Sequence, residues 1–159
     1  MASPATIYHC KVKELPSQLA LSIRLRTPVS ELSQRVGRAF GAIAAYLADQ
    51  GLSPAGVPFV AYYNMDMKDL DIEAVIPVAR KLLGRGNIQC RQFPGGKAAV
   101  CLHVGAYDQI GAAYNGLNEW LKANQLQGIG VAYEFYLNDP AVTPREALRT
   151  EVAMPLKAA

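Results

Sequence analysis

The sequence predicts an α+β fold in which one strand-strand-helix-strand-strand unit occurs twice, the two copies being related by a pseudo-twofold axis. Short segments rich in β-branched and aromatic residues flank two longer segments with helical periodicity. Residues of the two halves also match at nearly constant separations: Pro16 and Pro94 are 78 positions apart, and Gly56 and Gly130 are 74 apart. The same two offsets relate Glu73 to Glu151, Pro77 to Pro155, Leu47 to Leu121, Tyr62 to Tyr136 and Asn64 to Asn138. We expect the four-residue change in offset to fall in a loop.

Two patterns support the elements of the first unit. Leucine and isoleucine at positions 19, 21, 23 and 25 alternate with other residues, which indicates a half-buried strand. Further on, apolar residues recur every three or four positions from Leu32 to Leu47, as on the inward face of a helix. The first unit is predicted to contain strands over residues 7–15, 19–27, 59–64 and 71–78, and a helix from about residue 30 to 49.

The second unit repeats this order. Its predicted strands span residues 88–93, 97–104, 130–140 and 148–156, and its helix follows residues 105–108 and ends near Asn124. One unit alone would leave a sheet face half covered. We therefore expect halves of about 7–80 and 87–156 to form a single domain over residues 1–159, with antiparallel strands and two helices around a central cleft.

Glu134 is the one charged residue in an otherwise apolar and aromatic strand segment. Alternation places it on one face with Ala132 and Tyr136, while Tyr133 and Phe135 point away and are expected to pack under a helix. A carboxylate there is explained by an edge strand in water, by a buried structural ion pair, or by a functional site. The duplication favours a functional site. The counterpart of Glu134 is Val60, whereas a charge that only kept a strand soluble could occur in both halves.

Composition excludes several classes of function. The net charge is +3, and the basic stretch from residue 80 to 91 is interrupted by glycines, so we expect no direct nucleic-acid binding. Cys10, Cys90 and Cys101 lack metal-ligand spacing and are expected to be free thiols; neither a metal nor a cofactor is expected. No segment approaches the roughly 18 apolar residues of a membrane span, and no signal peptide is evident. A cytoplasmic protein without a membrane partner is therefore expected.

Several segments together resemble the GyrI-like small-molecule-binding family. This family provides the effector-binding domain, of a SOUL-like fold, in bacterial AraC-type and MerR-type multidrug regulators such as BmrR, and it also occurs alone. The resemblance extends from about residue 7 to 156. The segments are Pro94-Gly-Gly-Lys97, Gly105-Ala-Tyr107, Trp120-Leu121, Glu134-Phe-Tyr136-Leu-Asn-Asp-Pro140 and Arg149-Thr-Glu151, followed by Pro155.

The resemblance implies a ligand and a site. Ligands of the family are typically lipophilic, often cationic aromatic molecules held between tyrosines and tryptophans, with a buried glutamate as counter-charge; the matching acid is Glu134. Some stand-alone members hydrolyse cyclopropane-containing genotoxic natural products, which would make Glu134 and Tyr136 catalytic. Two features depart from the family. The sequence leaves no room for a helix-turn-helix, so direct transcriptional control is not expected, and Tyr133 stands where Trp is common.

The aromatic residues are assigned accordingly. Tyr136 and Tyr62 are expected to be walls of the ligand site, beside Glu134 and Val60. Trp120 is either a further wall or core, and Tyr107 either reaches the cleft or packs at the surface. Tyr114, Tyr46 and His103 are assigned to the core, and Arg149-Thr-Glu151 is interpreted as strand-edge structure.

Three functions remain open. The first is multidrug sensing or sequestration of a lipophilic, cationic aromatic molecule, and the second is the ring-opening hydrolase. The third is a gyrase-inhibitor-like interaction with a protein, which would need an exposed apolar patch. A homodimer is compatible with each of them.

Overall fold

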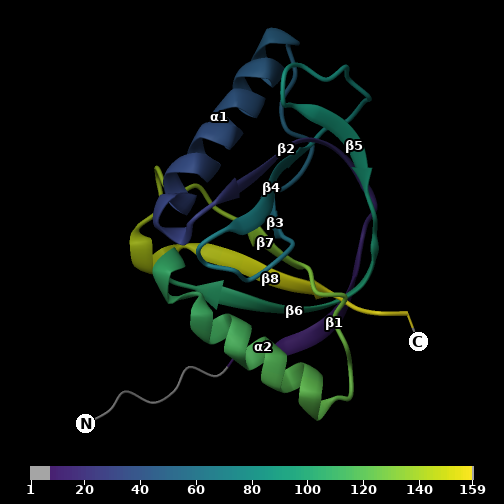
Figure 1. Ribbon diagram of the computed structural model, residues 1–159, viewed down its shortest axis with the longest axis vertical. Coiled ribbons are helices and arrows are strands. Elements are labelled where there is room, and N and C mark those ends of the chain that lie inside the picture. Colours follow the sequence, from purple (N-terminus) through teal and green to yellow (C-terminus); the bar gives the residue numbers. More distant parts are fainter. Residues whose placement is uncertain (1–7, 159) are drawn as a thin grey trace.

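The computed structural model describes residues 8–158 and shows a curled antiparallel sheet of eight strands with two helices (Figure 1). The strands are β1 (Cys10–Leu15), β2 (Gln18–Thr27), β3 (Phe59–Tyr62), β4 (Leu70–Pro77), β5 (Gln89–Phe93), β6 (Gly96–Val104), β7 (Ala132–Tyr136) and β8 (Arg149–Pro155). The helices are α1 (Leu32–Asp49) and α2 (Gly111–Ala123), and short 3-10 turns precede α1, α2 and β8. The predicted α+β fold is confirmed. Ile7, which begins the first predicted strand, lies outside the described residues.

The order of strands in the sheet is β1-β6-β8-β7-β3-β4-β2-β5, so the two units exchange their first strands. β1 pairs with β6 of the second unit, and β5 pairs with β2 of the first. The connectors that follow the exchanged strands touch: the Ser17 hydroxyl donates to the carbonyl of Phe93, and a Cβ added at Gly95 would lie 2.5 Å from the Leu15 carbonyl oxygen. Only glycine fits at this contact, which draws the ends of the curled sheet together.

The pseudo-twofold axis passes between β3 and β7. These strands pair in the middle of the sheet with Val60 directly opposite Glu134. Because these two residues are also counterparts in the duplication, 74 positions apart, they lie on either side of the axis. The single carboxylate that distinguishes the two halves is therefore at the centre of the molecule.

The two faces of the sheet are buried in different ways. One face carries both helices: α1 packs on β2 and β4, whereas α2 packs on β6 and β1. The other face lies inside the curl, where a cluster formed by strand residues and their flanks includes Phe59, Phe93, Tyr133 and Phe135. The prediction that Tyr133 and Phe135 pack under a helix is wrong, since no helix residue belongs to this cluster. Both helices lie on the Glu134 side.

Three further expectations are corrected. α1 has 18 residues and α2 has 13, so the offset changes from 78 to 74 within the helices and not in a loop, whereas it returns to 78 in the loops that precede β4 and β8. β7 lies between β8 and β3, which excludes an edge strand for Glu134. β8 lies between β6 and β7, so Arg149-Thr-Glu151 is not strand-edge structure.

None of the helices in the described range 8–158 is long and apolar enough to span a membrane.

Candidate functional site

Glu134 lies between the two helices, on the strand nearest the pseudo-twofold axis. Its side chain faces the apolar cluster that joins α1, α2 and the central strands, and the residue is only 7% exposed. Val60 and Val152 flank it on the neighbouring strands. Charge in such surroundings is costly unless hydrogen bonds or an opposite charge compensate it.

Three tyrosine hydroxyls surround the carboxylate. Tyr114 donates to Oε2 at 2.5 Å, and Tyr136 donates to Oε1 at 3.0 Å. Tyr62 lies 3.5 Å from Oε1, at the outer limit of a hydrogen bond. These donors come from α2, β7 and β3, so the site joins the two halves of the molecule. Among the described residues, no Lys, Arg or His forms an ion pair with Glu134, which excludes the buried structural ion pair considered above.

Burial controls the protonation of this cluster. It raises the pKa of Glu134, and the hydrogen bonds from Tyr114, Tyr136 and Tyr62 offset only part of that effect. Burial and the neighbouring carboxylate also raise the pKa of Tyr114 and of Tyr136 well above the ordinary value. The tyrosines therefore remain protonated donors, and Glu134 is the group that gains or loses a proton.

The structure brings most of the predicted residues together. Val60, Tyr62 and Tyr136 adjoin Glu134, and the ring of Tyr107 lies 5.4 Å from the ring of Tyr136. Trp120 is partly buried against the same apolar cluster. The rings of Phe40 on α1 and Tyr136 meet edge to face at 6.3 Å.

Tyr114 belongs to the site, which the sequence does not predict. Its place on the inward stripe of its helix predicts a core residue, and its ring does pack against the apolar cluster. A signal was nevertheless present, since a buried tyrosine hydroxyl usually needs a hydrogen-bond partner. Glu134 was the buried acceptor that the sequence had already indicated.

His103 and Thr150 lie beside this cluster on the same face. His103 is buried, with Nε2 2.9 Å from the carbonyl oxygen of Ala106 and Nδ1 3.0 Å from the hydroxyl of Tyr8. These contacts are those of a core histidine. Thr150 lies opposite both His103 and Tyr136 in the sheet, is fully buried, and has no hydrogen-bond partner for its hydroxyl within residues 8–158.

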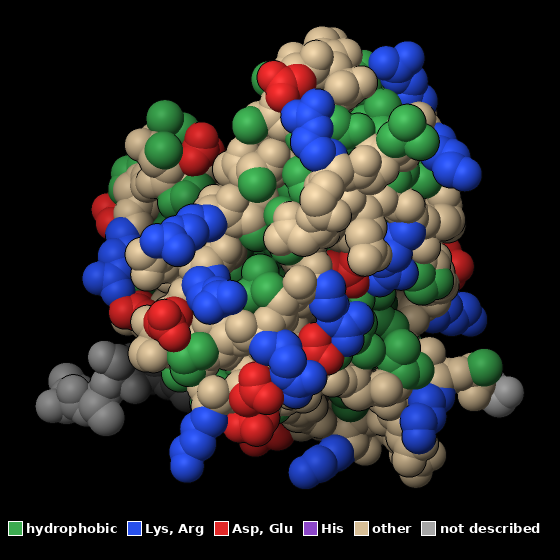
Figure 2. Space-filling view, turned by 45° about the horizontal axis from the view of Figure 1, so that its top comes forward, with side chains coloured by type: hydrophobic (Ala, Val, Ile, Leu, Met, Phe, Trp, Pro, Cys, Tyr) green, Lys and Arg blue, Asp and Glu red, His purple; other side chains and the backbone are tan. Residues whose placement is uncertain are grey.

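Glu134 and Tyr62 are almost fully buried in this structure. Two hollows are open to solvent, one beside α1 near Arg35 and the other near Arg145, and neither is lined by Glu134 or its tyrosines. On the face shown in Figure 2, basic and acidic side chains are interspersed and do not gather into a stripe of one sign. A molecule that reaches Glu134 must separate the side chains above it.

The chain resembles several solved structures. It superposes on EcmrR in an EcmrR–DNA complex with a TM-score of 0.86 and 22% identity, covering 96% of this chain but only 59% of EcmrR. It superposes on a hydrolase from Listeria innocua with a TM-score of 0.69 and 12% identity, covering 96% and 94% of the two chains. For SAV2435 bound to tetraphenylphosphonium, the TM-score is 0.67 and the identity 15%, with 94% of each chain covered. At these low identities the TM-scores establish a shared fold alone.

Comparison with curated proteins finds no match. A family model, however, matches residues 9–157, nearly the whole length that the curled sheet and its two helices occupy. That model describes the GyrI-like small molecule binding domain. The duplicated fold and the sequence match agree, and the chain belongs to the GyrI-like small-molecule-binding domain family.

Proposed function

We propose that this domain binds a lipophilic organic cation at Glu134, as part of multidrug sensing or sequestration. The observation that carries the proposal is a buried carboxylate that accepts hydrogen bonds from tyrosines and forms no ion pair with a basic residue of the described chain, His103 acting on it only as a more distant group. A bound cation would supply the missing positive charge where little water screens it. The faces of the surrounding tyrosine rings would add cation–π attraction of roughly 0.5–2 kcal/mol each.

Binding requires the side chains above Glu134 to move apart. Phe40 of α1 and Tyr107, which precedes α2, both contact Tyr136 and lie over this region. The two helices rest on different strands, α1 on β2 and β4 and α2 on β6 and β1. A separation between them would therefore open the site without breaking the sheet. The unpaired hydroxyl of Thr150 would offer a hydrogen bond to a polar group of the ligand.

The related structures support this choice of ligand. SAV2435, which shares the fold, is bound to tetraphenylphosphonium, a lipophilic aromatic cation. EcmrR, which also shares it, forms a complex with DNA and is longer than this chain. If the domain acts in sensing, a DNA-binding segment or partner would have to transmit the signal.

A second function is favoured by the distance between Tyr114 and Glu134. A hydroxyl 2.5 Å from a carboxylate of raised pKa is suited to proton transfer. Glu134 would take a proton from water, whose oxygen would attack an electrophilic carbon of a strained ring, and Tyr136 would protonate the carbon or oxygen released. Glu134 would then return its proton to Tyr136, whose hydroxyl oxygen lies 3.0 Å from the carboxylate. A hydrolase from Listeria innocua has the same fold. This function shares the pocket and differs only in turnover.

The test compares tetraphenylphosphonium with neutral triphenylphosphine oxide, followed by the fluorescence of Trp120, the single tryptophan of the chain. We expect the wild type to prefer the cation, and Glu134→Gln to weaken cation binding by about tenfold or more while changing the neutral affinity little. Glu151→Gln is the matched control, because it removes a carboxylate that pairs with Lys13 away from the site. Equal cation binding by Glu134→Gln and the wild type would contradict the proposal. Incubation with a cyclopropane-containing electrophile and mass spectrometry for added water would detect the hydrolase.

A further inference from the structure

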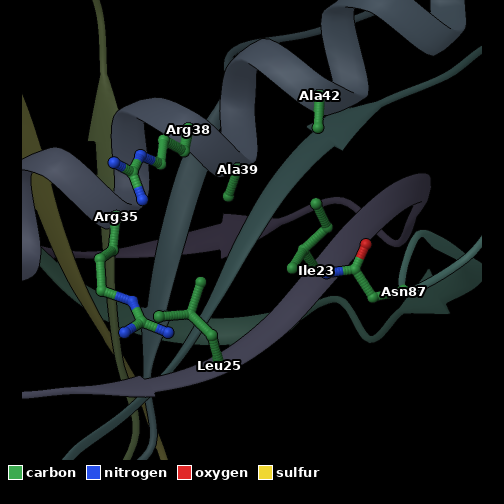
Figure 3. A pocket seen from close by; sticks show the side chains of 7 residues that line it. All are labelled: Ile23, Leu25, Arg35, Arg38, Ala39, Ala42 and Asn87. Atoms are coloured by element: carbon green, nitrogen blue, oxygen red, sulfur yellow. The ribbon is translucent and has the colours of Figure 1, made fainter.

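A groove beside α1 is the larger of the two open hollows, at about 390 Å³. Ile23 and Leu25 of β2 line one side and Ala39 and Ala42 of α1 the other (Figure 3). Asn87 lies at the end near Ile23, and Arg35 and Arg38 reach toward the opposite end near Leu25. It is separate from Glu134, which does not line it. Its volume is within the range of small-molecule sites.

The duplication shows what fits in such a groove, because the corresponding space in the second half is filled. Counterparts follow from the offset of 78 between β2 and β6 and the offset of 74 between the buried stripes of α1 and α2. The counterparts of Ile23, Leu25, Ala39 and Ala42 are Cys101, His103, Ala113 and Gly116.

Tyr8 occupies the corresponding space. Its ring stacks on His103 with the centroids 6.1 Å apart, and its hydroxyl lies 3.0 Å from Nδ1 of the same residue. On the helix side it approaches Gly116 so closely that an added Cβ there would lie 3.4 Å from the ring. One aromatic ring therefore fits between strand and helix at this position of the fold.

The first half has no aromatic ring at the corresponding position, because a tight turn with a glycine stands there. The counterpart of Tyr8 is Gly86, which has a φ of +58° and sits in a tight turn closed by two hydrogen bonds between Arg85 and Ile88. Gly86 carries no side chain, and a Cβ added there would meet nothing within 4 Å. A tyrosine at this position would be strained by the positive φ. The space opposite Leu25 is thus left for a separate molecule.

The charge of the groove specifies the class of that molecule. Arg35 and Arg38 are exposed, and neither forms an ion pair with a carboxylate of the described chain. At either offset their counterparts in the filled half are uncharged, Gln109 or Ala113 for Arg35 and Ala112 or Gly116 for Arg38, so the positive charge belongs to the open groove alone. Guanidinium groups bind carboxylates through charged, often bidentate hydrogen bonds.

We propose that this groove binds a small aromatic carboxylate, with its ring between β2 and α1 where Tyr8 lies in the other half and its carboxylate on Arg35 and Arg38. The site is independent of the cation site at Glu134. It would allow a single domain to bind two ligands of opposite charge on the two sides of α1.

The test is a titration of the protein with 2-naphthoate, followed by the amide resonances in ¹H–¹⁵N NMR spectra. We expect saturable shifts concentrated at Ala39, Ala42 and Asn87. The double variant Arg35→Gln/Arg38→Gln should weaken binding by about tenfold or more, and Ala42→Tyr should block it by filling the groove. Neutral 2-naphthamide should bind more weakly than 2-naphthoate to the wild type.

Two controls make the result decisive. Arg80→Gln removes an exposed arginine outside the groove and should bind 2-naphthoate like the wild type, as should Glu134→Gln. Well-dispersed spectra of each variant show that it is folded. Shifts centred elsewhere, or unchanged binding by both the double variant and Ala42→Tyr, would overturn the proposal.

Discussion

Glu73 and Glu134 are both buried glutamates, on β4 and β7, but they face opposite sides of the sheet. Glu73 accepts hydrogen bonds from Arg91, Ser22 and Tyr63, the closest to Arg91 being 2.7 Å. Burial raises its pKa, but these hydrogen bonds and the charge of Arg91 outweigh burial and leave the pKa lowered. Glu134 accepts hydrogen bonds from tyrosines alone, and burial outweighs these bonds and the weaker effect of His103, so its pKa is raised.

The difference separates a structural acid from an acid suited to binding. Arg91 belongs to β5, the strand that the second unit contributes to the first. Its ion pair with Glu73 on β4 therefore holds an exchanged strand to the first unit. The counterparts of Arg91 and Glu73 at the 78-residue offset are Lys13 and Glu151, which form the equivalent pair at the other edge. Glu134 has no such pair and remains available to a charge from outside.

Removing the cation from Glu73 should have the largest effect on stability. Arg91→Met leaves a buried carboxylate unpaired and is expected to lower the free energy of unfolding by about 2–3 kcal/mol, less than for a fully buried pair because the guanidinium is partly exposed. Lys13→Met is the matched control: its pair is more exposed, so we expect a loss under about 1 kcal/mol. Urea unfolding at pH 7 measures both. Equal losses would mean that burial of Glu73 has little energetic weight.

Removing the charge of Glu134 should instead stabilise the fold at neutral pH. The pKa of Glu134 in the folded state lies above the ordinary value of 4.5. Between these two pKa values the folded state binds more protons than the unfolded state, so the stability of the fold decreases as the pH rises. Glu134→Gln should therefore gain about 1 kcal/mol over the wild type at pH 8, or roughly 2–4 °C in Tm, and little at pH 4.

Glu73→Gln tests the opposite sign. Its folded pKa is lowered, so the stability it contributes is present above 4.5 and is lost as pH falls through the lowered pKa. The loss of stability caused by Glu73→Gln should therefore become smaller toward low pH. Thermal melts of Glu134→Gln and Glu73→Gln from pH 4 to 8 test both predictions. If the change in Tm relative to the wild type varied with pH in the same direction for both variants, the two acids would not differ as proposed.

The smallest effect concerns the tyrosines around Glu134. Tyr114→Phe removes the donor at 2.5 Å and should raise the pKa of Glu134 further than Tyr62→Phe, whose hydroxyl lies at 3.5 Å. A ¹³C NMR titration of the Glu134 carboxyl measures this. Tyr46→Phe, whose hydroxyl donates to the Leu83 carbonyl, is the control. An equal response to Tyr114→Phe and Tyr62→Phe would show that these distances do not govern proton affinity.

Much of what distinguishes Glu134 could be predicted from the alternation of residues along its strand and from the internal repeat of the sequence. Alternation along β7 placed Glu134 and Tyr136 on one face, and the internal repeat identified Val60 as the counterpart of Glu134. These inferences rest on period and offset, which tertiary packing does not alter.

What sequence patterns could not supply depended on contacts between distant segments. Both faces of the sheet are apolar at its centre, so alternation did not show that the helices cover the Glu134 side and leave Phe135 within the curl. An interior strand and an edge strand share the same period, which concealed the place of β8. The helical stripe placed Tyr114 inward but did not show which atom its hydroxyl would meet.

The position of Val60 opposite Glu134 on the pseudo-twofold axis also bears on how such a site can evolve. A dimer of identical half-length chains must place the same side chain on both sides of its axis, giving either two carboxylates in contact or none. Two like charges directly opposite each other in a sheet repel. Fusion of the two copies into one gene lets a single codon change break that symmetry, and one negative charge can then stand alone at the centre.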